Sequence, residues 1–150
     1  MTTMVSEVMT TNVKVATPNQ TIRQVAQMMA ELDAGVLPVR EEDHLVGVIT
    51  DRDIAVRAVA EGMPPSTKVS KVMSAEVKYC FDDDDLDHVA RNMADIKVRR
   101  LPVVNRDKRL VGILSLGDMA LADGPDNAGT ALCGISEPGG EHSQAAHAKH

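Results

Sequence analysis

Residues 45–53 of the chain read LVGVITDRD, and residues 110–118 repeat this stretch as LVGILSLGD. The repetition extends outward, because the opening VSEVM at residues 5–9 returns as VSKVM at residues 69–73. A sequence that is written twice predicts two copies of one structural unit, related by approximate symmetry. A unit of about 60 residues buries too little apolar surface to be comfortably stable alone. We therefore expect the two copies to share a core and to enclose matching clefts for a ligand.

The composition of the 150-residue chain is typical of a globular protein and argues against several classes of partner. The formal net charge of −6 disfavours a nucleic-acid partner, because phosphate backbones are bound by clustered lysines and arginines. Tyr79 and Phe81 are the two aromatic residues, so a base-stacking platform is not expected. No apolar run approaches the roughly 20 residues of a membrane span, and no signal-peptide pattern is present. We expect a cytoplasmic protein that binds neither nucleic acid nor membrane.

Each copy predicts the element order strand, helix, strand, strand, helix, which is a mixed α+β fold. In the first copy, residues 13–16 alternate as a short strand, and a helix begins at its N-cap Thr21 and ends at Gly35. Two strands follow at residues 36–39 and 45–49, joined by a polar turn short enough for a hairpin. A second helix begins directly after the last strand, and the second copy runs through the same elements.

The two copies are assigned to residues 4–62 and 66–123, within one module. Residues 124–150 are rich in Gly, Ala, Ser, Pro and His without periodicity, which predicts a disordered tail. Cys80 lies in an apolar pattern and is expected to be a buried thiol, whereas Cys133 is expected to be an incidental thiol of the tail.

No metal site is predicted. The histidines of the tail follow no compact spacing of zinc ligands, so a solvated tail is favoured over a zinc site. Residues 82–85 are four consecutive aspartates, and Mg²⁺ is one interpretation of such a run. The favoured interpretation is that these acids compensate the dipole of the helix that follows, with Asp85 as its N-cap.

The sharpest local pattern is Gly-x-x-Thr/Ser-x-x-Asp, which occurs at residues 47–53 and 112–118. Two interpretations use the same geometry. A hydroxyl residue followed three positions later by an acid, where a strand ends and a helix begins, is close to a capping box. The same helix start offers unpaired N–H groups to a phosphate, and its carboxylate is able to accept two ribose hydroxyls. The local pattern leaves capping and ligand binding open.

The ordered combination of Val-Met openings, Leu-Pro-Val strands and Gly-x-x-Thr/Ser-x-x-Asp motifs over residues 4–122 resembles a pair of CBS domains, the repeat named after cystathionine β-synthase. Chains of this length with a Thr-Asp-Arg-Asp segment resemble small stand-alone bacterial regulatory proteins. The resemblance implies tandem β-α-β-β-α repeats, packed with pseudo-two-fold symmetry into one Bateman-type module. It also implies a homodimer, the default symmetric assembly, and a regulated protein that the sequence does not identify.

The function implied by the resemblance is a sensor of adenosyl ligands, a regulatory module of signal transduction or energy sensing. AMP, ADP and ATP are the first candidates, and S-adenosylmethionine and NAD rank behind them. No obligatory cofactor is implied. Catalytic triads, phosphate-cradling loops and helical metal-ligand pairs are absent from the sequence, so an enzyme is not expected. The alternative is a CBS pair that binds no ligand and serves structure or protein interaction, with the motif residues acting as caps.

Ligand-binding members of the family use the motif Asp for the ribose hydroxyls, the Thr or Ser near ribose or phosphate, and strand segments around the adenine. The positions carried over to this chain are, in the first copy, Val48, Thr50 and Asp53, and in the second copy, Ile113, Ser115 and Asp118. Four further positions resemble segments that line adenine and phosphate: Lys14, Gly35, Lys78 and Arg99.

The two copies differ where a phosphate is expected. Gly35 of the first copy is replaced by Arg99 in the second, where Arg100 follows, and Arg52 has a glycine as its counterpart. Arginine binds phosphate bidentately, so Arg52, Arg99 and Arg100 are candidates for reading the number of phosphates. Their alternative role is that of exposed arginines that solubilise an acidic protein. We expect two clefts of different affinity or ligand preference.

Overall fold

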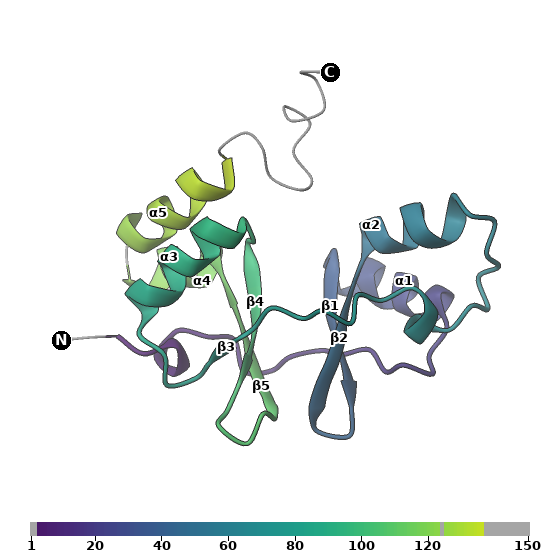
Figure 1. Ribbon diagram of the computed structural model, residues 1–150, viewed down its shortest axis with the longest axis horizontal. Coiled ribbons are helices and arrows are strands. Elements are labelled where there is room, and N and C mark those ends of the chain that lie inside the picture. The colour runs from purple at the N-terminus through teal and green to yellow at the C-terminus, as the bar shows by residue number, and fades with distance from the viewer. Residues whose placement is uncertain (1–2, 124, 137–150) are drawn as a thin grey trace. The chain divides into compact units, whose positions relative to one another are not determined.

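The computed structural model describes residues 3–123 and 125–136, which divide into two compact units (Figure 1). We call them the first-copy unit, residues 13–78 with 107–110, and the second-copy unit, residues 3–12, 79–106 and the described residues from 111 onward. The fold is mixed α+β, as predicted. Among the helices that the structure describes, none has the length and apolar composition that a membrane crossing requires.

The first-copy unit is a two-stranded antiparallel sheet with helices. Strand β1 (Val36–Glu41) pairs with β2 (His44–Thr50), and the register places Leu37 opposite Ile49. The predicted strand at residues 13–16 is reduced to a single parallel bridge between Ala16 and Val39. The remaining elements are α1 (Ile22–Leu32), α2 (Asp51–Asp53), the π-helix η2 (Ile54–Val59) and the 3-10 helix η3 (Val69–Lys71).

Helix α1 begins as the sequence predicted and ends earlier. Thr21 Oγ1 accepts the N–H of Gln24 at 3.1 Å, and the Gln24 side chain accepts the N–H of Thr21 at 2.9 Å, which confirms the capping box. The predicted end at Gly35 is wrong, because the helix stops at Leu32 and Asp33 takes the left-handed conformation, with φ of 52°. Aspartate tolerates this conformation, so no glycine is required there.

The second-copy unit has a three-stranded sheet in the order β3-β4-β5, with β3 parallel to β4. Asp85 is the N-cap of helix α3, since its side chain accepts the N–H of Asp87 at 3.0 Å, and this confirms the prediction. The elements are the 3-10 helix η1 (Val5–Glu7), β3 (Cys80–Phe81), α3 (Leu86–Ile96), β4 (Arg100–Val104), β5 (Leu110–Ser115), α4 (Leu116–Asp123) and α5 (Pro125–Ser136).

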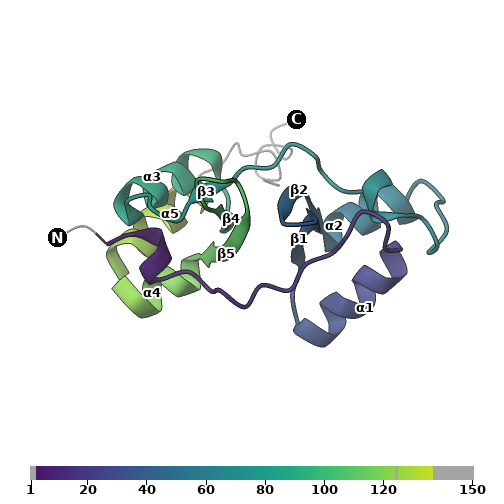
Figure 2. The ribbon, with the colours of Figure 1, turned by 90° about the horizontal axis from the view of Figure 1, so that it is seen from below.

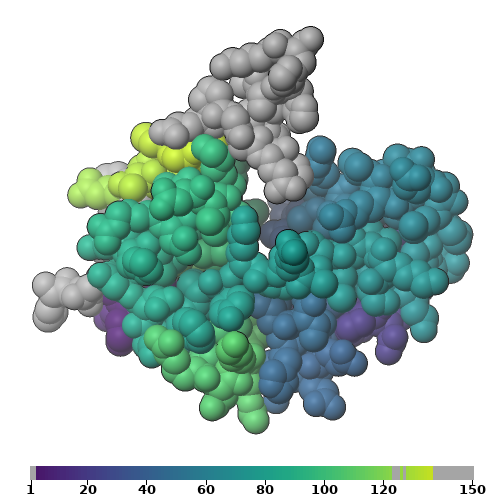
Figure 3. Space-filling view, in the orientation of Figure 1, coloured from purple at the N-terminus to yellow at the C-terminus, as the bar shows by residue number. Residues whose placement is uncertain are grey.

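Helix α5 occupies part of the segment for which the sequence predicted disorder. It lies beside α3 in both ribbon views, and their surfaces adjoin in the space-filling view (Figures 1, 2 and 3). Ala131 is buried, and a Cβ on Gly134 would lie only 2.4 Å from the Cβ of Ala94. Small side chains on one face of α5 therefore allow it to pack closely against α3. A sequence prediction based on large apolar residues does not detect such a helix. The predictions for residues 137–150 lie outside the described residues.

The opening segment of each copy, residues 3–12 of the first and residues 67–76 of the second, packs within the unit of the other copy. Val5 N–H donates to Asp84 O at 3.0 Å, and the N–H of Leu86 donates to Thr3 O at 2.8 Å. The same bonds recur in the first-copy unit, where Val69 N–H donates to Gln20 O at 2.8 Å. Each opening segment thus satisfies main-chain groups at the start of the other copy's first helix.

This exchange corrects the expectation of a shared core. The described residues form two hydrophobic cores, one in each unit. Val5 of the first copy is fully buried in the second-copy core, and Val69 and Val72 of the second copy are fully buried in the first-copy core. The copies depend on each other because each core is completed by residues of the other copy.

The glycines of the two motifs, Gly47 and Gly112, leave room for the opening segments. A Cβ on Gly47 would lie 2.7 Å from Met73 Sδ and 2.9 Å from the carbonyl oxygen of Ser74. A Cβ on Gly112 would meet Met9 Sδ at 2.7 Å and the carbonyl oxygen of Thr10 at 2.9 Å. A flexible thioether is able to move, but a main-chain carbonyl is not, so glycine is required at both places.

Substituting Gly112 tests this packing. We expect Gly112→Ala to lower the free energy of unfolding by about 1–3 kcal/mol, because the added methyl group displaces the opening segment. The matched control is Gly129→Ala in helix α5, where a Cβ meets nothing within 4 Å and the substitution raises the stability by up to about 1 kcal/mol. Urea denaturation measures the free energy of unfolding of both variants. Equal stabilities of the two variants would contradict the close packing of the opening segment against Gly112.

The two cysteines differ in reactivity. Burial raises the pKa of Cys80 to about 12, and the nearby charge of Asp84 adds to this, whereas Cys133 is exposed. Because the thiolate is the reactive form, a thiol reagent at pH 8 is expected to modify Cys133 rapidly and Cys80 only after denaturation. Mass spectrometry counts the labels, and Cys133→Ser is expected to leave no rapidly labelled thiol. Rapid double labelling of the native protein would show that Cys80 is accessible.

Candidate functional site

The first motif site consists of Val48, Thr50 and Asp53, where strand β2 ends and helix α2 begins. Thr50 Oγ1 accepts the N–H of Asp53 at 2.9 Å, and Asp53 Oδ2 accepts the N–H of Thr50 at 3.0 Å. All three residues are partly buried. This reciprocal pair of hydrogen bonds is a capping box, and it fixes the hydroxyl beside the carboxylate.

The second motif site consists of Ile113, Ser115 and Asp118, where strand β5 passes into helix α4. Ser115 Oγ accepts the N–H of Asp118 at 3.1 Å, and Asp118 Oδ2 accepts the N–H of Ser115 at 3.1 Å. These residues are also partly buried. Both copies therefore build the same arrangement, in which one carboxylate oxygen caps the helix.

The other carboxylate oxygen, Oδ1, has a different neighbour in each copy. Asp53 Oδ1 lies 3.8 Å from the guanidinium of Arg57, whose Nη1 is also 3.4 Å from the carbonyl oxygen of Met73. Asp118 Oδ1 accepts a hydrogen bond of 3.2 Å from the hydroxyl of Thr10. Sequence reasoning missed both neighbours. Arg57 has a local signal, since it lies one helical turn after Asp53, but Thr10 has none.

Residues at the Gly35 position lie beside the helix start in both copies. Gly35 O accepts the N–H of Asp51 at 2.9 Å, and a Cβ on Gly35 would lie 3.0 Å from Asp51 Oδ2. In the second copy, Arg99 O accepts the N–H of Leu116 at 3.2 Å, and the Arg99 side chain is exposed. The structure therefore brings Gly35 and Arg99 to their motif sites through main-chain contacts.

The lysines and arginines among the predicted site residues, Arg99 included, have exposed side chains. The N–H of Arg52 donates to Asp51 Oδ1 at 2.8 Å, but this bond does not involve the guanidinium. Within the described part of the chain, no ion pair connects these side chains to an acidic residue. The residues are Lys14, Arg52, Lys78, Arg99 and Arg100.

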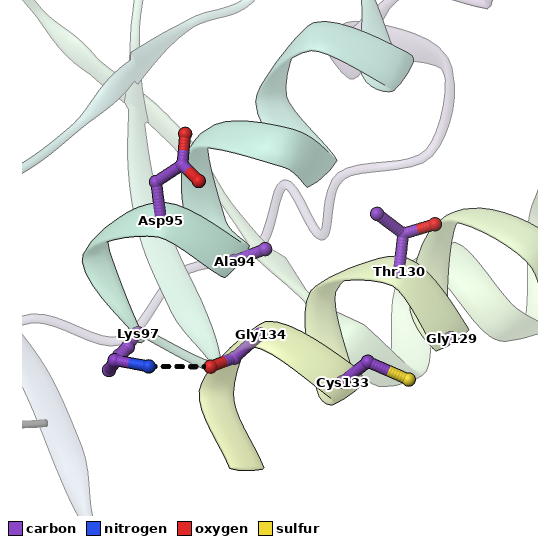
Figure 4. A pocket seen from close by; sticks show the side chains of 7 residues that line it. All are labelled: Ala94, Asp95, Lys97, Gly129, Thr130, Cys133 and Gly134. Carbon is purple, nitrogen blue, oxygen red and sulfur yellow. Dashed lines mark hydrogen bonds between the residues drawn. The ribbon is translucent and has the colours of Figure 1, made fainter. Parts of the chain in front are cut away.

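A hollow of about 630 Å³ lies elsewhere, between helices α3 and α5 of the second-copy unit (Figure 4). None of the predicted site residues lines it. The Lys97 ammonium donates to the carbonyl oxygen of Gly134 at 2.9 Å, so this lysine of the hollow caps the C-terminal end of α5. The lining residues are Ala94, Asp95, Lys97, Gly129, Thr130, Cys133 and Gly134.

Three of the four aspartates at residues 82–85 have separate roles in the fold. Asp83 forms two hydrogen bonds with the Arg106 guanidinium, at 2.6 and 2.9 Å, and this hydrogen bonding lowers the pKa of the Asp83 carboxyl. Asp84 accepts the N–H of Phe81 at 2.9 Å, and Asp85 caps helix α3. Among the residues that the structure describes, no group of three or more His, Cys, Asp or Glu side chains is arranged to hold a metal ion.

Removing a motif hydroxyl tests the capping contribution. We expect Thr50→Ala and Ser115→Ala each to lower the free energy of unfolding by about 1 kcal/mol, because a helix-start N–H loses its acceptor. The control is Ser70→Ala, at an exposed position of η3, which we expect to be neutral. Thermal or urea denaturation measures the free energy of unfolding of each variant relative to the wild type. Unchanged stability of both motif variants would show that the caps do not stabilise the fold.

Comparison with known proteins identifies a family for both copies. The sequence profile of the CBS domain family matches residues 5–59 and again residues 69–123. The chain is similar to the CBS domain-containing protein YhcV of Bacillus subtilis, with 42% identity over 133 residues that cover 88% of this chain and 94% of that protein.

Solved structures with the same fold include two ligand complexes. The structure of CBSX2 in complex with AMP has a TM-score of 0.71 and 28% identity, covering 80% of this chain and 95% of CBSX2. The CBS domain pair of protein MJ0100, in complex with 5′-methylthioadenosine and S-adenosyl-L-methionine, has a TM-score of 0.71 and 29% identity, covering 83% of this chain and 98% of that one.

Proposed function

The chain belongs to the CBS domain family, with two copies of the domain, and from this premise we propose that it is a regulatory module that binds an adenosyl ligand. The observation that carries the proposal is the construction of the same hydroxyl and carboxylate pair in both copies. The complexes of CBSX2 with AMP and of the MJ0100 CBS domain pair with 5′-methylthioadenosine and S-adenosyl-L-methionine support this ligand class. AMP, ADP and ATP are the first candidates, and S-adenosylmethionine and NAD follow.

The motif sites have the donors and acceptors that a ribose requires. Each carboxylate oxygen has two lone pairs, so Asp53 and Asp118 are able to accept ribose hydroxyls while they cap their helices. The hydroxyls of Thr50 and Ser115 accept an N–H and keep their own hydrogen for a ribose or phosphate oxygen. The partly buried Val48 and Ile113 supply apolar surface for a base.

The proposed sites differ in their phosphate binding. The exposed guanidinium groups of Arg52, Arg99 and Arg100 are free to bind phosphate bidentately. Arg52 lies at the helix start of the first motif site and has Gly117 as its counterpart, whereas Arg99 takes the place of Gly35 in the second copy, so the differing cations have different positions in the two sites. The main chain and side chains near Lys14 and Lys78 complete the proposed ligand contacts.

We propose that the module works in the cytoplasm as a homodimer that signals ligand binding to another protein. A symmetric dimer is the commonest assembly of soluble proteins, and exposed apolar side chains are available for the contact: Val59 of η2 is 67% exposed and Leu121 of α4 is 91% exposed. The proposal contains no catalytic step, and the similar proteins YhcV, CBSX2 and the MJ0100 pair are CBS domain proteins.

A second candidate function is a CBS pair that binds no ligand and serves structure or protein interaction. The complete capping boxes favour it, because Thr50, Asp53, Ser115 and Asp118 already have hydrogen-bond partners in the protein. In this case the motif is retained for helix capping alone.

Calorimetric titration with AMP, ADP, ATP, NAD and S-adenosylmethionine separates the two functions. We expect the wild type to bind at least one of them, and Asp53→Ala and Asp118→Ala each to abolish binding at one site, because the ribose hydroxyls lose their acceptor. The control is Glu31→Ala, which removes an exposed acid of α1.

Thermal shift gives an independent measurement. A ligand at 100 times its Kd stabilises the folded protein by about 2.7 kcal/mol. If every compound fails to bind, and both aspartate variants lose only about 1 kcal/mol of capping energy, the ligand-free function is correct.

A further inference from the structure

We infer that Thr10 is a positioning residue of the second motif site, where its hydroxyl holds the Asp118 carboxylate in the orientation that the ligand requires. The inference rests on the proposed function and adds to that site a residue that lies 108 positions away in the sequence. Its first observation is the hydrogen bond of 3.2 Å from Thr10 Oγ1 to Asp118 Oδ1. Thr10 comes from the opening segment of the first copy, whereas Asp118 belongs to the second.

The main chain of Thr10 is held in place by the strand that leads to Asp118. Its N–H donates to Ile113 O at 2.8 Å, and its carbonyl oxygen accepts the N–H of Ile113 at 2.9 Å. The carbonyl also lies so close to Gly112 that no Cβ fits between them. Threonine is β-branched, which restricts its χ1 angle. The Thr10 hydroxyl is therefore presented from a fixed main chain by a stiff side chain.

Asp118 is consequently held at both carboxylate oxygens. Oδ2 accepts the N–H of Ser115, and Oδ1 accepts the hydroxyl of Thr10. The terminal torsion of an aspartate is broad when it is free, so two donors on opposite oxygens restrict it. Each oxygen still has a lone pair for a ribose hydroxyl. A carboxylate that is oriented before the ligand arrives costs less conformational entropy on binding.

The first copy orients its carboxylate by other means. Ser74, at the position that matches Thr10, makes the same two main-chain bonds with Val48, at 3.0 and 2.9 Å. Its hydroxyl forms no hydrogen bond with Asp53 in the described part of the chain. The neighbour of Asp53 is the Arg57 guanidinium, at 3.8 Å, and the second copy has an alanine in place of Arg57. Thr10 therefore acts specifically on the second motif site.

The test removes the Thr10 hydroxyl while only the second motif site is able to bind. In the Asp53→Ala background, calorimetry with adenosine as the probe compares Thr10→Val, which keeps the β-branched shape, with Thr10→Ser, which keeps the hydroxyl. Thr11→Val is the matched control, because Thr11 is the exposed neighbour in the same segment. We expect Thr10→Val to weaken adenosine binding about tenfold, the change produced by about 1.4 kcal/mol, and the other two variants to change it less than twofold.

Two further measurements separate positioning from damage to the fold. In the Asp118→Ala background, Thr10→Val is expected to leave adenosine binding at the first motif site unchanged. Amide hydrogen exchange of the ligand-free protein is expected to show Thr10 and Ile113 equally protected in Thr10→Val and wild type. Loss of this protection, or equal affinities of the Thr10→Val and Thr11→Val proteins, would overturn the inference.

The failure of the proposed function gives a different result. If the wild type binds neither adenosine nor any adenine nucleotide, the proposed function is wrong and Thr10 has no ligand site to position. If the wild type binds and Thr10→Val binds equally well, the proposed function stands and the role of Thr10 is wrong.

Discussion

The structure depends on one kind of contact, which occurs in both units. Each opening segment pairs through its main chain with the strand that leads into the other copy's motif. Thr10 and Ser74 each form two main-chain hydrogen bonds with their strands, to Ile113 and Val48 respectively. The residue before Val48 is Gly47 and the residue before Ile113 is Gly112, because a Cβ at either position would collide with the carbonyl of the opening segment. The same segments deliver buried valines to the two cores. Neither core is complete without a segment of the other copy, so folding couples the two copies.

This contact determines the geometry of the two motif sites. The strand is held by the opening segment, the helix start is held by its capping box, and the carboxylate lies at their junction. A guanidinium stands beside Asp53, and a neutral hydroxyl stands beside Asp118. Because the scaffold is duplicated and these neighbours are not, the two sites have the same framework and different electrostatics.

Much of the local structure was predictable, and the errors have physical causes. The caps at Thr21 and Asp85 were correct, since capping depends on residues three positions apart or fewer. The helix end at Gly35 was wrong because Asp33 adopts the left-handed conformation earlier. Helix α5 was missed because its packing against α3 uses alanine and glycine, which produce no strong apolar pattern.

The sequence by itself determined the duplication, the α+β class, the family and the residues of the two capping boxes, because these are carried by local patterns that occur twice. The tertiary structure decided which segment completes which core and which residue faces each Asp Oδ1. Thr10 reaches Asp118 across 108 residues, and no local pattern connects them. Main-chain pairing between distant segments creates that proximity, and such pairing becomes visible only when the chain has folded.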